Sequence, residues 1–149
     1  MIIGQNGLDI IKKFESFRSR PYLCPSGIPT IGYGSTYYLD GTKVTLNDKP
    51  ISKAGAENLL LHITNRDFAS VVNKYVRVPL TQNQFDALVS LAYNIGGSRF
   101  RKSTLVKKLN QYDYVGAANS FWMWRRSGRK ILKGLVRRRA EEKKLFNRV

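Results

Sequence analysis

Apolar residues recur at helical spacing near the start of the chain and again over most of its second half. Asn6 is a plausible N-cap, and the apolar stripe that follows it predicts a helix over residues 6–18. Ser52 is a plausible N-cap for a long amphipathic helix that ends before Pro79, because proline cannot continue a helix. The opening and the middle of the chain are therefore predicted to be helical.

The second half of the chain reads as a series of helices. Thr81 and Gln84 have the spacing of a capping box, and this box opens a helix that ends at Gly96. Ser103 and Asp113 are the expected caps of later helices. Three shorter helices are expected there, over residues 103–110, 113–125 and 135–147.

The segment between the first two predicted helices differs from them in composition. From Pro21 to Leu46 it is rich in Gly, Pro, Ser, Thr and Tyr. Residues 30–34 and 37–41 look like short strands joined by turns. This is the only part of the sequence that we expect to form β-structure.

Length and composition fit one domain with a real core. The chain has 149 residues, of which 42% are hydrophobic, and no repeat or long linker divides it. We therefore predict a single α+β domain over residues 1–149. Its small β lobe is expected at about residues 18–48, and its larger helical part at about residues 1–17 and 50–149.

The charge of the chain predicts an anionic partner. Twenty-six Lys and Arg against ten Asp and Glu give a net charge of +16, which attracts nucleic acid, anionic lipid or a cell-wall polymer. Residues 125–149 hold eleven of these cations, interleaved with apolar residues. Such a basic amphipathic helix can lie on an anionic membrane surface. Alternatively, its apolar residues pack on the helical part and leave the cations in solvent.

Cysteine and histidine are each present once. Cys24 excludes an internal disulfide, so we expect synthesis in a reducing cytoplasm. We find no signal peptide and no apolar run of about 18 residues, and a target outside the membrane would then require a separate releasing factor. His62 has no Cys, Asp or Glu arranged with it, so we read it as structural and expect neither a metal nor a cofactor.

Glu15 is a candidate catalytic acid. It lies near the C-terminal end of the first predicted helix, between Phe14 and Phe17. Apolar surroundings and the negative end of a helix dipole both disfavour a carboxylate, as a proton donor requires. It is also the only acid between Asp9 and Asp40. Composition and helix position alone favour a solvated glutamate on an amphipathic helix.

The spacing around Glu15 favours the catalytic interpretation. Eight residues separate Glu15 from Cys24, and five more separate Cys24 from Thr30, which opens a Thr-Ile-Gly-Tyr-Gly run. This arrangement resembles the signature of the phage-type lysozymes, or endolysins, of glycoside hydrolase family 24. Further segments resemble that family in the same order: residues 79–88, 94–96, Phe100, 103–105, 109–110, Trp124, and 134–139 with Glu142.

The resemblance implies a lysozyme-like fold with a catalytic cleft between the β lobe and the helical part. It also implies hydrolysis of the β-1,4 bond between N-acetylmuramic acid and N-acetylglucosamine in bacterial peptidoglycan, which lyses the host cell. Glu15 would be the general acid, and Thr30 would help to place the attacking water. Cys24 stands where the family more often has Asp, so the identity of the general base stays open.

A thiol is an unusual base for this reaction. Its unperturbed pKa is about 8.5, so only a few per cent is thiolate at neutral pH unless its surroundings lower that value. Cys24 can orient water, act as a weak base, or act as a nucleophile in a double displacement. Without the resemblance, Cys24 would read as a small buried apolar residue.

The resemblance extends to substrate binding and to release. It implies that Tyr33, Asn94 and Arg138 contact the glycan, with Arg138 reaching towards Glu15; the alternative for Arg138 is a solvated basic helix face. Ser35 replaces the family's usual His, so it is given no catalytic role. The expected partners are peptidoglycan and an anionic lipopolysaccharide or membrane surface. We expect a monomer that reaches the periplasm through a holin-like pore.

Two other classes of function fit the charge. A nucleic-acid-binding protein would use Tyr37, Tyr38, Trp122 and Trp124 as stacking groups, although no helix-turn-helix, zinc-finger or RNA-recognition signature is present. A cationic membrane-disrupting protein would act through residues 125–149 without hydrolysis. Loss of lysis on Glu15→Gln separates both classes from a glycosidase.

Overall fold

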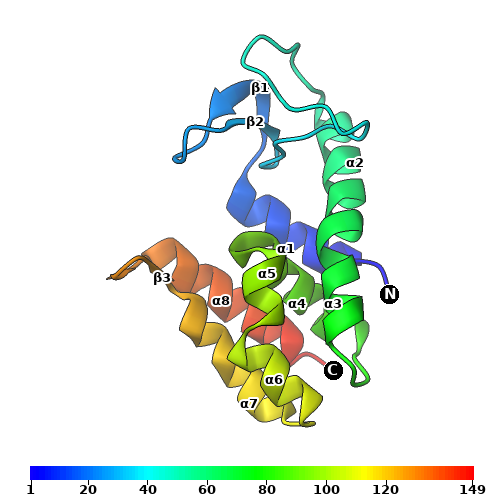
Figure 1. The fold of residues 1–149 in the computed structure, drawn as a ribbon, viewed down its shortest axis with the longest axis vertical. Coiled ribbons are helices and arrows are strands. Elements are labelled where there is room, and N and C mark those ends of the chain that lie inside the picture. The colour runs from blue at the N-terminus through cyan, green and yellow to red at the C-terminus, as the bar shows by residue number, and fades with distance from the viewer. The chain divides into compact units, whose positions relative to one another are not determined.

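The computed structural model describes all 149 residues and divides them into two compact units. The smaller unit is residues 11–63, and the larger unit is residues 1–10 together with 64–149. Figure 1 labels most of the elements. In chain order they are α1 (Gln5–Glu15), β1 (Arg18–Leu23), β2 (Pro29–Gly32), α2 (Lys53–Thr64), the π-helical η1 (Asn65–Ala69), α3 (Ser70–Tyr75), α4 (Gln82–Ile95), α5 (Gly97–Arg101), α6 (Thr104–Asn110), α7 (Tyr114–Ser120), the 3-10 helix η2 (Phe121–Trp124), β3 (Arg126–Ser127), β4 (Lys130–Ile131) and α8 (Lys133–Phe146).

Helix α4 is the centre of the larger unit. Every residue from Phe85 to Ala92 is buried, as expected for a helix covered on all sides. Helix α8 packs along α4 and against η2, where the rings of Phe121 and Phe146 lie 5.7 Å apart. Leu145 and Phe146 are buried in this packing. The apolar end of α8 therefore belongs to the core of the unit.

The start of α1 is also part of the larger unit, and α4 supplies its cap. The buried carboxylate of Asp86 accepts hydrogen bonds from the backbone N–H groups of Gly4 (2.8 Å) and Gly7 (3.1 Å). A carboxylate suits this position because the first N–H groups of a helix are unpaired and carry partial positive charge. Asn6, which we expected to be the cap, instead donates to the side chain of Asn83.

The smaller unit contains an antiparallel hairpin and helix α2. Strands β1 and β2 pair with Tyr22 opposite Thr30, and the register is irregular between Arg18 and Tyr22. Ser52 caps α2 as predicted, because its Oγ accepts the N–H of Gly55 at 3.0 Å. The buried apolar residues of this unit are Ile11, Ile31, Tyr33, Val44, Ala56, Leu59, Leu60 and Ile63.

The first predicted helix is three residues too long. Helix α1 ends at Glu15, and Ser16 adopts a left-handed conformation with φ of +60°. This conformation stops a helix, and β1 begins at Arg18. Residues that we assigned to the last turn of the helix therefore start the β-hairpin.

The predicted helices of the second half are confirmed, with some differences at their ends. Thr81 and Gln84 form the expected capping box, and Ser103 and Asp113 cap α6 and α7 through N–H groups of their first turns. The long helix before Pro79 exists as α2, η1 and α3 in direct succession. No helix combines the length and apolar character of a membrane span.

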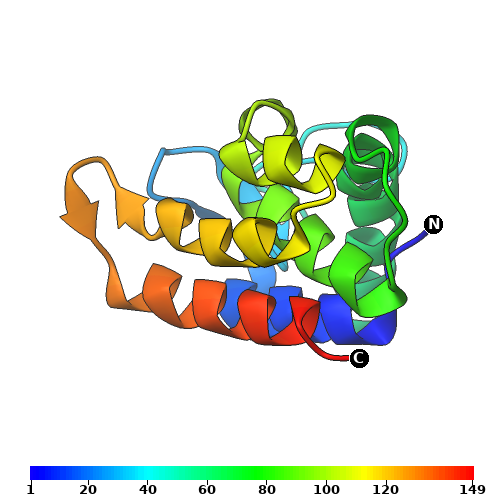
Figure 2. The ribbon, with the colours of Figure 1, turned by 90° about the horizontal axis from the view of Figure 1, so that it is seen from below.

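A second hairpin corrects the expectation that only the segment after the first helix forms β-structure. Strands β3 and β4 pair Arg126 with Ile131 and Ser127 with Lys130, and Gly128 takes φ of +61° at the turn. Figure 2 shows this hairpin extending beyond the end of η2 and the start of α8. It was missed because two-residue strands are too short to show alternation.

Candidate active site

Glu15 lies where the first helix stops. It is the last residue of α1 and is half-buried. Helix α1 carries Lys12 and Lys13 in its last turn, and Lys12 pairs with Glu57 of α2 at 3.4 Å. The carboxylate of Glu15 therefore lies at the C-terminal, negative end of the α1 helix dipole.

Cys24 lies directly after β1, in a tight turn between the two strands. Its N–H donates to the carbonyl of Ile28 at 3.1 Å, and its own carbonyl accepts the N–H of Gly27 at 2.8 Å. Gly27 has φ of +80°, a conformation that glycine adopts without strain. The Sγ atom lies 3.0 Å from Oγ of Ser26. The turn thus fixes the thiol beside a hydroxyl group.

Hydrogen bonds lower the pKa of Cys24 to about 7. The largest cause is the hydroxyl of Ser26, followed by the backbone of Ile28, with a smaller contribution from Thr30. Each stabilises the thiolate, and the small desolvation of this half-exposed side chain does not offset them. About half of the thiol is therefore ionised at neutral pH, rather than a few per cent.

Thr30 is buried in β2 and points its proton back into the turn. Its Oγ1 donates to the carbonyl of Ile28 at 2.8 Å. A hydroxyl has one proton and two lone pairs, so the oxygen of Thr30 stays able to accept a hydrogen bond. Thr30 and Cys24 are thus joined through the same short turn.

Tyr22 also belongs to this candidate site, although it is not among the predicted site residues. It stands opposite Thr30 in the hairpin, so these two side chains lie on one side of the pleat, and Cys24 follows two residues later in the turn. The guanidinium of Arg18 lies 4.4 Å from the centre of its ring. Desolvation raises the pKa of Tyr22, and the charges of Glu15 and Cys24 raise it further.

The phenol of Tyr22 is therefore close enough to both candidate catalytic groups for their charges to raise its pKa. It stays protonated at neutral pH and keeps an O–H to donate. The sequence signal that could have identified Tyr22 is strand alternation, which places residues two apart on one face. Because the first helix is predicted to run to residue 18, this strand and its register are not predicted.

Tyr33 is packed inside the smaller unit. Only 4% of its surface is exposed, and its ring lies 5.6 Å from that of Phe17. Gly32 and Gly34 on either side both have positive φ values, so the Thr-Ile-Gly-Tyr-Gly run turns at this residue. The glycan contact expected of Tyr33 stays a prediction.

Arg138 belongs to a buried polar cluster of the larger unit, and the exposed Asn94 contacts that cluster through Arg139. Glu142 is fully buried, with Arg139 at 2.8 Å, Arg138 at 3.3 Å and the hydroxyl of Ser90 donating at 2.6 Å. Arg139 also donates to Oδ1 of Asn94 at 2.8 Å. The alternative interpretation of Arg138 as part of a solvated basic face is therefore wrong.

Burial and ion pairing oppose each other in this cluster. Desolvation raises the pKa of Glu142 and lowers that of Arg139, while each charge favours the ionised form of the other. One consequence concerns Asn94, which is exposed at the end of α4. Because Arg139 binds its oxygen, its amide N–H₂ group is left to donate.

The structure thus divides the predicted site residues between two groups. Glu15, Cys24, Thr30 and Tyr33 lie in the smaller unit, whereas Asn94 and Arg138 lie in the larger one. His62 is exposed on α2, and no three His, Cys, Asp or Glu side chains are grouped as metal ligands would be.

Comparison with known proteins defines the class of this fold. The structure superposes on an endolysin from Escherichia coli O157:H7 phage FAHEc1 with a TM-score of 0.88 and 38% identity, covering 99% of this chain and 94% of that one. It superposes on the muramidase domain of SpmX from Asticaccaulis excentricus with a TM-score of 0.86 and 33% identity, covering 99% and 98%. The fold is therefore an α+β, lysozyme-like one.

The sequence comparisons identify the family. The model of the phage lysozyme family matches residues 12–142. The chain is 42% identical to an endolysin of Acyrthosiphon pisum secondary endosymbiont phage 1, over 98% of both chains. It spans only about half the length of two other relatives, 54% and 55%. The chain belongs to the phage lysozyme family.

Proposed function

We propose that this lysozyme cleaves the β-1,4 bond between N-acetylmuramic acid and N-acetylglucosamine as a member of glycoside hydrolase family 24. Membership of the phage lysozyme family makes it a peptidoglycan-hydrolysing enzyme. The proposal adds the bond and the residues that act on it. Its main support is the short turn that holds a partly ionised thiol beside Thr30, in the same unit as Glu15.

Glu15 and Thr30 take separate roles in the proposed reaction. Glu15 gives its proton to the glycosidic oxygen as the bond to the anomeric carbon breaks, so the leaving sugar departs as a neutral alcohol. Thr30 accepts a hydrogen bond from the attacking water, because its own proton is directed to the carbonyl of Ile28. This contact orients a lone pair of the water towards the sugar.

Cys24 has two chemically balanced roles. As a general base, its thiolate takes a proton from the water while the hydroxide joins the anomeric carbon, and the configuration inverts. As a nucleophile, it bonds to the anomeric carbon as Glu15 protonates the leaving oxygen. Water then displaces the thiolate while the Glu15 carboxylate takes the proton of the water, and the configuration is retained. A pKa of about 7 supplies the thiolate for either role.

The role of Glu15 is tested by Glu15→Gln, which keeps the shape of the side chain and removes the proton. We expect lysis of permeabilised bacteria, followed by turbidity, to fall at least about 100-fold. Glu57→Gln is the matched control, because Glu57 is a partly exposed acid of the same unit that pairs with Lys12. Full lysis by Glu15→Gln with an unchanged melting temperature would refute the assignment.

The role of Cys24 is tested by stereochemistry and substitution together. NMR of the freshly released anomer distinguishes inversion from retention. Cys24→Asp supplies a carboxylate in place of the thiolate, and Cys24→Ser supplies neither a base nor a good nucleophile at neutral pH. We expect activity with Asp and a large loss with Ser. Full activity with Ser would mean that the thiolate is not required.

We further propose that Tyr33, Asn94 and Arg138 contact the glycan. Asn94 has the clearest basis, because it is exposed and Arg139 binds its amide oxygen, which leaves the N–H₂ group to donate. Asn94→Ala should raise KM more than it lowers kcat. Equal KM values for Asn94→Ala and wild type would exclude Asn94 from substrate binding.

Two expectations about the protein in the cell complete the proposal. We propose that it acts as a monomer, which analytical ultracentrifugation would test. We also propose release to the periplasm through a holin-like pore. Lysis that starts at the same time with and without a co-expressed holin would contradict that route.

A further inference from the structure

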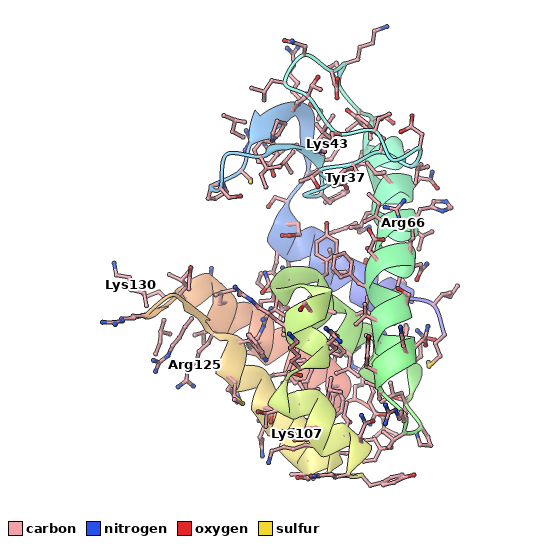
Figure 3. The ribbon with its side chains drawn as sticks, viewed as in Figure 1. Tyr37, Lys43, Arg66, Lys107, Arg125 and Lys130 are labelled. Atoms are coloured by element: carbon pink, nitrogen blue, oxygen red, sulfur yellow. The ribbon has the colours of Figure 1, made fainter.

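The hairpin between η2 and α8 carries exposed cations and exposed apolar side chains together. We call residues 125–132 the basic hairpin. Arg126, Arg129 and Lys130 are exposed, and Ile131 and Leu132 expose 52% and 40% of their surfaces. Figure 3 shows Lys130 near the tip and Arg125 near the base. Arg126 and Ile131 are directly opposite in the ladder, so a cation and an apolar side chain share one face.

No acid in the surrounding sequence balances these cations. The chain has neither Asp nor Glu between Asp113 and Glu141. Glu142, on the helix that follows, is already bound to Arg138 and Arg139 inside the larger unit. The basic hairpin therefore carries a local excess of positive charge, and this charge attracts an anionic partner.

The basic hairpin is held at its base and not along its length. Arg139 donates to the carbonyl of Trp124 at 3.3 Å, and the N–H of Leu132 donates to the carbonyl of Arg125 at 3.1 Å. Beyond these bonds, all four strand residues are exposed. A two-stranded hairpin without a core is marginally stable in water. Its Ile131 and Leu132 thus keep 52% and 40% of their surfaces in solvent.

The combination of charges and apolar side chains selects the kind of partner. A dissolved polyanion would pair with the cations and leave Ile131 and Leu132 in water. A bilayer with anionic headgroups accepts both, because phosphates bind the cations and the boundary of the acyl chains takes the apolar side chains. We propose that the basic hairpin docks on an anionic phospholipid surface.

This surface differs from the one that the sequence predicted. The expected membrane-binding element was the amphipathic C-terminal helix, but Leu145 and Phe146 of α8 are buried in the larger unit. The helix therefore has no free apolar face at that end. The basic hairpin instead has two exposed apolar side chains next to each other, Ile131 and Leu132.

Vesicle binding tests the proposal with the full chain and without peptidoglycan, so its outcome is separate from that of the hydrolase assignment. The probe is co-sedimentation at physiological salt with vesicles of phosphatidylglycerol and phosphatidylcholine, compared with phosphatidylcholine alone. We expect binding only to the anionic vesicles. Equal binding to the neutral vesicles would overturn the proposal.

The cations are tested by a triple variant and a control of equal charge. Arg126→Gln, Arg129→Gln and Lys130→Gln together should weaken binding about 100-fold, since each cation at such a surface contributes about fivefold. The control variant replaces three exposed lysines elsewhere with Gln, so its net charge equals that of the triple variant. Equal losses in the two variants would show binding by total charge and would overturn the proposal. The control positions are Lys43, Lys102 and Lys107.

The apolar side chains distinguish a bilayer from a dissolved polyanion. Ile131→Ser with Leu132→Ser removes no charge, and both positions are exposed, so the fold should be kept. We expect about tenfold weaker vesicle binding, because partial burial of the two side chains is lost. Wild-type binding by this double variant, with an unchanged melting temperature, would overturn lipid docking and indicate a polyanion in solution as the partner.

Discussion

The hydroxyl of Ser26 should control the ionisation of Cys24. It is the largest of the causes that lower the pKa of the thiol to about 7, and its Oγ lies 3.0 Å from Sγ. Ser26→Ala removes this hydrogen bond and leaves the backbone of the turn in place. The pKa should therefore rise part of the way back to the ordinary value of about 8.5.

The size of the effect follows from the fraction of thiolate. At pH 7, a pKa of about 7 gives about half thiolate, whereas a pKa of about 8.5 gives about 3%, a difference of about 15-fold. The backbone of Ile28 and the hydroxyl of Thr30 persist in the variant, so Ser26→Ala should lose only part of that factor. A loss of about three- to tenfold in thiolate at pH 7 is expected.

Alkylation by iodoacetamide measures this fraction directly. The thiolate is the reacting form, and Cys24 is the only cysteine, so mass spectrometry follows one product. The rate should show a midpoint near pH 7 in the wild type and a higher midpoint in Ser26→Ala. A wild-type midpoint above pH 8, unchanged by Ser26→Ala, would refute the role assigned to the turn and weaken both proposed roles of Cys24.

Three further predictions concern other contacts. Tyr22→Phe should lower kcat about tenfold with an unchanged melting temperature, because it removes an O–H near two proposed catalytic groups, Glu15 and Cys24; unaltered kcat would exclude Tyr22 from the site. Glu142→Ala should destabilise the fold by about 3–5 kcal/mol, since it leaves two buried arginines unpaired. Urea titration measures the free energy of unfolding, and the control Glu57→Ala, at a partly exposed acid, should cost less than about 1 kcal/mol. Equal losses for Glu142→Ala and Glu57→Ala would contradict the role given to the buried ion pairs. Thr81→Ala should cost about 1 kcal/mol by removing the capping box, and a neutral result would count against that cap.

Local patterns predicted much of this fold because the decisive contacts are local. The capping box at Thr81 joins residues three apart, and so do the caps at Ser52 and Ser103. The spacing from Glu15 to Cys24 and Thr30 likewise places three candidate residues in one compact unit. Such short-range chemistry is visible in a sequence without any knowledge of the fold.

Contacts between distant residues could not be read in the same way. Asp86 caps α1 from 82 residues away, and no residue near Gly4 in the sequence indicates this contact. Arg139 and Glu142 look like part of a solvated charged helix until the packing of α8 on α4 buries them. The pKa of Cys24 likewise depended on where a turn would direct the Ser26 hydroxyl.

The cap of α1 also constrains when the chain can fold during synthesis. Residues 1–10 belong to a compact unit whose other residues begin at Thr64, and Gly4 meets its acceptor only when Asp86 has been made. Helix α8, which packs along α4 in that unit, is made after α4. Contacts of such large sequence separation form late. The ribosome therefore carries a chain whose first helix lacks its cap until α4 has emerged, so hydrolytic activity is expected only after α8 has been made.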